Sequence, residues 1–180
     1  MSDAEADSIL RFWFEEHPGE WFVKDPSFDR EIRMRFLGLH EAAAAGQRVH
    51  WADGARYCLA LVIVLDQFPR NMFRGEARAF ATDPLARAAA RVILARGWHK
   101  QMAQPEQLFA YLPFEHSESL ADQDLSVELM KDFDEEQRRY ARRHREIIER
   151  FGRFPHRNGV LGRESTAAEI EFLKLPGSGF

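Results

Sequence analysis

Apolar residues recur three and four positions apart along most of this chain, with polar residues between them, which is the period of an amphipathic α-helix. One run places Phe28, Ile32 and Phe36 on one helical face. It opens on Asp25-Pro26, an N-cap followed by a proline at the first helical position, and it ends near Gly46. The same reasoning predicts helices over residues 3–16, 26–46, 53–69, 83–96, 105–112, 117–132 (opened by Ser117 or Ser119) and 135–151, and a short one after the capping box of Thr166 and Glu169.

Seven to eight helices with short connections and no convincing strand pair predict an all-α fold, either a bundle or a stack of helix pairs. The chain has 180 residues, 45% of them hydrophobic, which is enough for one sizeable core. We therefore expect a single helical domain over residues 1–180, with a frayed tail over residues 175–180.

Charge excludes some classes of partner. The net charge is −4 and the pI about 6.0, so there is no overall basic character that would favour nucleic acid or an anionic membrane. The N-terminus is acidic where a secretory signal would be basic, and no apolar run approaches a membrane span, so we expect a cytoplasmic protein. The single cysteine, Cys58, lies in an apolar run and is expected to be inert core. The oligomeric state is left open.

Three short segments collect the polar side chains that could do chemistry. Each follows an apolar helical stretch and precedes another, and each combines an aromatic residue and proline with Arg, His, Asn or carboxylates. Sites are often built where rigid elements end. The segments are Leu65-Asp66-Gln67-Phe68-Pro69-Arg70-Asn71, Pro113-Phe114-Glu115-His116-Ser117-Glu118 and Arg153-Phe154-Pro155-His156-Arg157-Asn158.

These segments, with Leu161-Gly162-Arg163-Glu164-Ser165-Thr166 behind the third, resemble the signature blocks of the uncharacterised family catalogued as domain of unknown function 924. The resemblance extends from Arg11-Phe12-Trp13-Phe14 to Phe172-Leu173, nearly the whole chain. It implies an all-helical fold of the tetratricopeptide-like superhelical type. It implies no activity, so function has to be argued from the residues.

Two polar residues stand on otherwise apolar helical faces. Asp66 continues the stripe of Leu59, Val62 and Ile63 at the helix end whose dipole disfavours a carboxylate, and His144 lies in the stripe of Tyr140, Ile147, Ile148 and Phe151. Asp66 therefore needs a cationic partner. The candidates are Arg70, Arg153, Arg157 and His144, and we expect the three segments to meet in space.

Such a meeting has two readings. In the first, arginine forks and carboxylates form a buried network that only fixes helix ends together. In the second, arginines outnumber the carboxylates Asp66, Glu115 and Glu118 and bind a small anion, a phosphorylated metabolite or a peptide. The ligand-binding candidates of the second reading are Gln67, Arg70, Asn71, Arg74, Arg153, His156, Arg157, Asn158 and Arg163.

The alternative function is a cytoplasmic hydrolase or transferase. His116 or His144 would be the general acid or base, with Asp66 or Glu118 orienting it. A metal held by His116, Glu118, His144 and His156 is disfavoured, because no His-rich helical spacing occurs and the arginines would repel a cation. No glycine-rich phosphate loop or dinucleotide fingerprint is present, so we expect no cofactor and leave open whether the protein is an enzyme.

Overall fold

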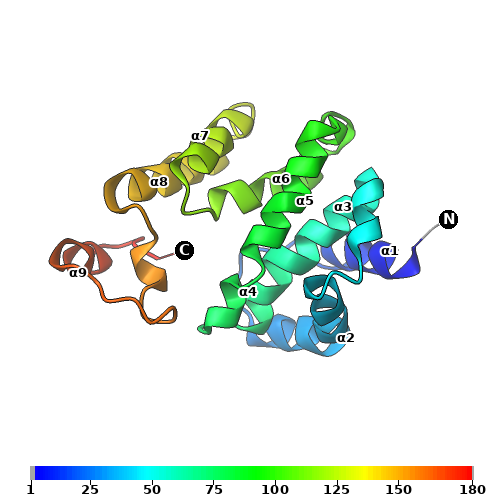
Figure 1. The fold of residues 1–180 in the computed structure, drawn as a ribbon, viewed down its shortest axis with the longest axis horizontal. Coiled ribbons are helices and arrows are strands. Elements are labelled where there is room, and N and C mark those ends of the chain that lie inside the picture. Colours follow the sequence, from blue (N-terminus) through cyan, green and yellow to red (C-terminus); the bar gives the residue numbers. More distant parts are fainter. Residues whose placement is uncertain (1–2, 180) are drawn as a thin grey trace. The chain divides into compact units, whose positions relative to one another are not determined.

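The computed structural model describes residues 3–179, and these form an all-helical fold without a β-strand (Figure 1). Because α3 and α4 join through a π-helical turn, the α-segments of the described chain make eight longer helices, which confirms the predicted fold class. Over the same residues, each helix is too short or too polar to span a lipid bilayer. The α-segments are α1 (Ala4–Arg11), α2 (Pro26–Ala44), α3 (Ala55–Val62), α4 (Phe68–Met72), α5 (Asp83–Ala95), α6 (Gln104–Glu115), α7 (Leu120–Leu129), α8 (Glu135–Phe151) and α9 (Ala167–Leu173).

The chain divides into two compact units, which we describe separately. Unit 1 comprises Met1–Arg74 and Arg78–Pro113, and unit 2 comprises Gly75–Ala77 and Phe114–Phe180. The later boundary, between Pro113 and Phe114, falls inside α6 and not in a linker.

Unit 1 is built on helix pairs around an aromatic core. α2 packs against α4, and α3 packs against both α1 and α5. Phe12, Trp13 and Phe68 are fully buried at its centre, and Phe109 meets Trp13 edge to face at 5.3 Å between ring centroids. The aromatic residues near the N-terminus are thus mainly core, although Phe22 is 69% exposed.

Unit 2 contains the α7–α8 pair, whose helices lie side by side in Figure 1. The buried face of α8 holds Ala141, His144, Ile147 and Ile148, so the prediction that His144 is buried is confirmed. Tyr140, which we expected in the same stripe, is 44% exposed. Ala141 takes the buried place one turn before His144, because the stripe is rotated by one residue from the predicted one.

Several predicted helix ends are confirmed by their caps. The Asp25 side chain accepts from the Ser27 amide at the start of α2, with Pro26 in the first turn. α8 runs over the predicted residues and ends at Gly152, whose φ of +69° suits glycine. The capping box of Thr166 and Glu169 opens α9 as predicted.

Other boundaries differ from the prediction. Asp53 belongs to a 3₁₀ turn, and α3 starts later, after Gly54. Thr82, and not Asp83, is the N-cap residue of α5. The helix predicted over residues 105–112 extends to Glu115 with Pro113 inside it, and the next helix starts after Ser119 and ends at Leu129 instead of Asp132. In the tail, Ser178 is buried and its hydroxyl donates to the Leu173 carbonyl, while Phe180 lies outside the described residues.

The largest correction concerns Pro69, which does not end its helix. The helical path continues from α3 through a π-helical turn over Ile63–Gln67 into α4. Proline has no N–H, so a carbonyl about one turn earlier loses its donor. In this turn, side chains contact three successive backbone carbonyls. His40 lies 3.0 Å from the Val64 carbonyl, Thr82 donates to the Leu65 carbonyl, and Arg70 donates to the Asp66 carbonyl. Asp66 therefore lies within a helix and not at its end.

Candidate functional site

In unit 1, Asp66 is at the centre of a buried ion-pair network. Its carboxylate is fully buried, and it lies 3.3 Å from an Arg70 guanidinium nitrogen and accepts from the Gln67 amide. The same guanidinium donates both Nη groups to the Asp83 carboxylate, at 2.8 and 3.0 Å. Burial opposes the charge of Arg70, but Asp66 and Asp83 raise its pKa above the ordinary value. Arg70 is thus a local partner of Asp66, as the sequence suggested.

A second arginine fork of unit 1 involves a carboxylate that the sequence did not indicate. Arg74 donates through Nε and Nη2 to Asp29 of α2, both at 2.8 Å, and Asn71 donates to the same carboxylate at 2.8 Å. Asn71 and Arg74, both candidate ligand residues, are therefore engaged with α2.

In unit 2, Glu118 holds the third signature segment in place. Its Oε1 accepts from the Phe154 amide at 2.8 Å, and its two oxygens accept from Nη2 and Nη1 of Arg163 at 2.9 and 2.7 Å. Arg163 also donates to the Phe154 carbonyl and to the Asn158 side chain. Burial would raise the pKa of Glu118, but these hydrogen bonds hold it below the ordinary value. The recorded partners of Glu118 are thus the Phe154 backbone amide and the Arg163 guanidinium, and not a histidine.

Arg153 and Asn158 contact α9 and the segment that leads into it. Arg153 donates to both oxygens of Glu169, at 2.6 and 2.8 Å, and the hydrogen bond from Arg153 is the main reason why the pKa of Glu169 falls to about 2. Asn158 donates to the Ser165 hydroxyl. Arg153, Asn158 and Arg163 therefore make contacts within unit 2 that fix its C-terminal segment.

Three further basic residues of unit 2 gather around the ring of Phe154, which is fully buried. The His144 and His156 rings each lie 5.6 Å from it, and the Arg157 guanidinium carbon stands 4.5 Å from the ring centre. Arg157 also donates to the His116 carbonyl at 3.0 Å. We call His116, His144, His156 and Arg157 the basic cluster.

His144 is held as a neutral imidazole. Its Nδ1 lies 2.9 Å from the Tyr140 carbonyl and 3.3 Å from a Glu115 carboxylate oxygen, so the ring N–H faces two acceptors. Burial lowers the pKa of His144 to about 3, and the positive charges of His116, Arg157 and His156 act in the same direction. This carboxylate–histidine pair is closed, because both side chains are more than nine-tenths buried.

Two units thus hold the predicted residues in separate groups. Unit 2 brings the segments 114–118 and 153–163 together, whereas Asp66, Gln67, Arg70, Asn71 and Arg74 are arranged within unit 1. The meeting of the first segment with the other two stays a prediction. Three carboxylates that engage the arginine forks were missed, because they lie far away in the sequence and show no helical spacing to their partners: Asp29, Asp83 and Glu169.

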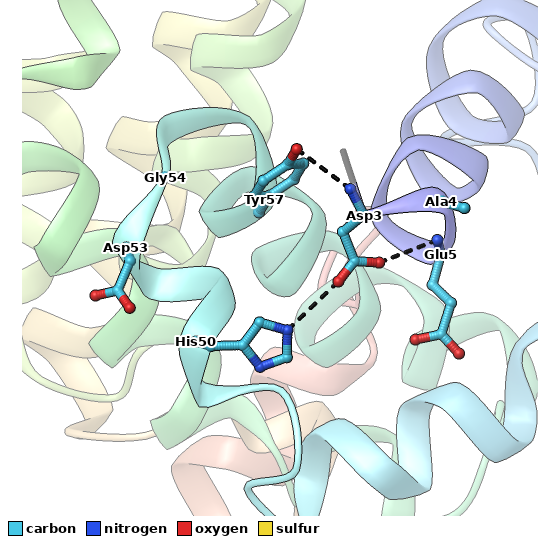
Figure 2. Close-up of a pocket in the computed structure, with 7 residues that line it drawn as sticks. All are labelled: Asp3, Ala4, Glu5, His50, Asp53, Gly54 and Tyr57. Atoms are coloured by element: carbon cyan, nitrogen blue, oxygen red, sulfur yellow. Dashed lines mark hydrogen bonds and ion pairs between the residues drawn. The ribbon is translucent and has the colours of Figure 1, made fainter. Parts of the chain in front are cut away.

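Two cavities are lined by residues outside the basic cluster. One of about 590 Å³ in unit 1 is lined by Asp3, Glu5, His50 and Tyr57, among others (Figure 2). Two of its carboxylates are engaged: Asp3 caps α1 and lies 3.4 Å from His50, and Glu5 pairs with Arg48. A second cavity, of about 480 Å³, borders the Arg153–Glu169 pair in unit 2. Over residues 3–179, no group of three His, Cys, Asp or Glu side chains is placed to hold a metal ion.

Comparison with known proteins places the chain beside proteins of undetermined role. The model of a family described as bacterial protein of unknown function (DUF924) matches residues 9–177. A solved structure of a protein of unknown function from Agrobacterium tumefaciens is 44% identical and superposes with a TM-score of 0.92, covering 95% of this chain and 97% of that one. The comparison with curated proteins found no match.

Proposed function

The chain belongs to the DUF924 family, and we propose that it is a binding module whose basic cluster captures the anionic group of a small molecule or peptide. The observation that carries this proposal is the gathering of His144, His156 and Arg157 around Phe154, while the nearby carboxylates Glu118 and Glu169 already serve Arg163 and Arg153. Arg157 and two partly exposed histidines therefore offer several N–H groups close together in a protein of negative net charge, although Glu115 lies beside His144.

Arg157 and His156 are the residues that would contact the anion. A guanidinium is planar and can offer two parallel N–H donors to a phosphate or carboxylate. His156 and His116 are partly exposed beside it, so a ligand could reach them from solvent. His144 and Arg157 are only 5% and 6% exposed, so His156 and His116 would form the outer contacts, Arg157 would meet the anion at the buried end, and His144 would pack against the Phe154 ring. Asn158 and Arg163 would position the segment.

Two further parts of the proposal concern the stacking of the helices and the cellular compartment. We propose that the helix pairs stack in the tetratricopeptide manner and that the protein acts in the cytoplasm. In unit 1, Gln67, Arg70, Asn71 and Arg74 remain candidate ligand residues of their own segment. The adjacent pairing of α3 with α5 and of α7 with α8 supports a helix-pair architecture.

The enzyme alternative rests on the Glu115–His144 contact, which resembles the carboxylate–histidine pairs that orient catalytic imidazoles. Two observations favour the binding module over it. His144 is only 5% exposed, and a base with a pKa of about 3 is too weak to accept a proton at neutral pH. A hydrolase or transferase would have to use His116, with Asp66 or Glu118 as the orienting group, and Glu118 is engaged by Arg163.

A thermal-shift series tests the proposal with phosphate, sulfate, citrate and chloride at one ionic strength. Phosphate at one hundred times its dissociation constant should add about 2.7 kcal/mol to the free energy of unfolding. Chloride should add much less, because it cannot accept two parallel guanidinium hydrogen bonds. Arg157→Gln and His156→Gln should each reduce the phosphate increment.

The matched control is Arg150→Gln, which removes an exposed arginine of the same unit that stacks on Phe151. It should keep the full phosphate increment. If Arg157→Gln does not fold, phosphate binding to wild type and to His156→Gln by calorimetric titration decides instead. Equal effects of all four anions on wild type would contradict the proposal. A larger effect of a divalent metal than of every anion would contradict it as well.

A further inference from the structure

Two polar atoms on one face of α7 have no hydrogen-bond partner among residues 3–179. They are Oε1 of Gln123 and Oγ of Ser126, and both residues are fully buried. Such atoms are rare in folded proteins, because a buried donor or acceptor without a partner destabilises the fold. Residues three positions apart on a helix are neighbours, so the two atoms lie on the same side of α7.

Exchanging the amide oxygen and nitrogen of Gln123 would not give Oε1 a hydrogen-bond partner. Its Nε2 donates to the carbonyls of Phe114, Glu115 and Ser117, at 3.4, 2.7 and 2.7 Å. Exchanging nitrogen and oxygen would place Oε1 against these carbonyl oxygens. The amide nitrogen therefore ties α7 to the end of α6, and Oε1 must face away from those carbonyls.

The helix that packs against α7 carries a small buried residue, Ala141. Arg145 of α8 donates to Asp124 of α7 at 2.6 Å, which sets the register of the pair. Because the chain turns back between Leu129 and Glu135, the helices run antiparallel, and Ser126 comes level with the turn of α8 that precedes Arg145. That turn contains Ala141, which is buried and carries only a methyl group.

We infer that Gln123 and Ser126 bind one buried water molecule between α7 and α8. The water donates one hydrogen to Oε1 of Gln123 and either accepts from or donates to the Ser126 hydroxyl. Buried waters commonly bridge two to four polar groups that the protein leaves unsatisfied. This site is separate from the basic cluster, and it explains how α7 can bury an amide and a hydroxyl together.

Two measurements on the full chain test the inference. In solution, nuclear Overhauser transfer should connect a long-lived water to the side-chain protons of Gln123 and Ser126. Ser126→Ala should abolish or weaken that transfer and lower the melting temperature, because Oε1 of Gln123 loses its bridge. If the hydroxyl has no water, the same substitution removes an unpaired polar group and should leave the melting temperature unchanged or raise it.

The matched control is Ser119→Ala, which removes an exposed hydroxyl that makes no capping hydrogen bond at the start of the same helix. It should leave the water signal unchanged. The inference is overturned if wild type shows no long-lived water at these protons, whatever the melting temperatures, or if a crystal structure shows Ser126 donating directly to Gln123 without an intervening water.

Discussion

At the scale of single residues, burial decides which charges the protein can tolerate. Asp66 occupies a fully buried place beside the Arg70 guanidinium, and Arg70 is shared with Asp83. For His144, burial and then the positive charges nearby lower the pKa, although the Glu115 carboxylate lies 3.3 Å from its ring. The residue that the sequence offered as a catalytic base is thus buried, with a lowered pKa, in the folded chain.

The neutral His144 makes stability depend on pH. Its pKa falls from 6.5 to about 3 on folding, so the unfolded chain binds the proton more tightly, and stability is complete above pH 6.5 and declines as the pH falls toward 3. Between pH 8 and pH 5, His144 alone should cost up to about 2 kcal/mol. Urea unfolding of wild type and His144→Gln at both pH values measures this, and the variant should show the smaller loss.

His50→Gln serves as the control, because His50 is largely exposed and its removal should leave the pH dependence as in wild type. His40, whose pKa burial also lowers, contributes equally to wild type and to both variants. An identical loss in wild type and His144→Gln would show that His144 is not held neutral.

At the scale of elements, prolines and π-helical turns place side chains where a regular helix would not. Pro69 leaves a carbonyl without its donor, and Thr82 from the start of α5 donates to the Leu65 carbonyl at 2.6 Å. One helix is thereby tied to the next through a hydrogen bond that no periodic pattern contains. The prediction of a helix end at this proline failed for that reason.

The bond from Thr82 is open to a double-mutant test. Thr82→Val keeps the shape but removes the donor, and it should lower the free energy of unfolding by about 1–3 kcal/mol. Pro69→Ala restores an N–H to the helix, so Thr82→Val should cost about 1 kcal/mol less in that background. Urea unfolding of the four proteins gives the coupling, with Thr82→Ser as the control that keeps the hydroxyl. Purely additive effects would mean that the two residues do not share the carbonyl.

At the scale of the whole molecule, the two compact units raise the question of whether the chain unfolds in one step. Domain boundaries usually fall in flexible linkers, but this one falls inside α6. Residues 75–77 also belong to unit 2 although unit 1 flanks them on both sides. These features favour the single domain that the sequence predicts.

We therefore expect one cooperative transition in scanning calorimetry, with a calorimetric enthalpy equal to the van't Hoff enthalpy. The fluorescence of Trp13 and Trp51, which belong to unit 1, and the helical circular dichroism of the whole chain should change at the same temperature. Two resolved transitions, or a tryptophan signal that changes before the dichroism, would instead identify two domains.

Local signals in the sequence determined where many helices begin and end. Asp25-Pro26, Gly152 and the Thr166–Glu169 capping box act through neighbouring residues, and the apolar period placed His144 in the core without any knowledge of its partners. Only the tertiary structure decided what the polar residues do. Arg70, Arg74 and Arg153 find Asp83, Asp29 and Glu169 between 13 and 45 residues away. Such pairings depend on how the helices pack, and no repeat along the chain records them.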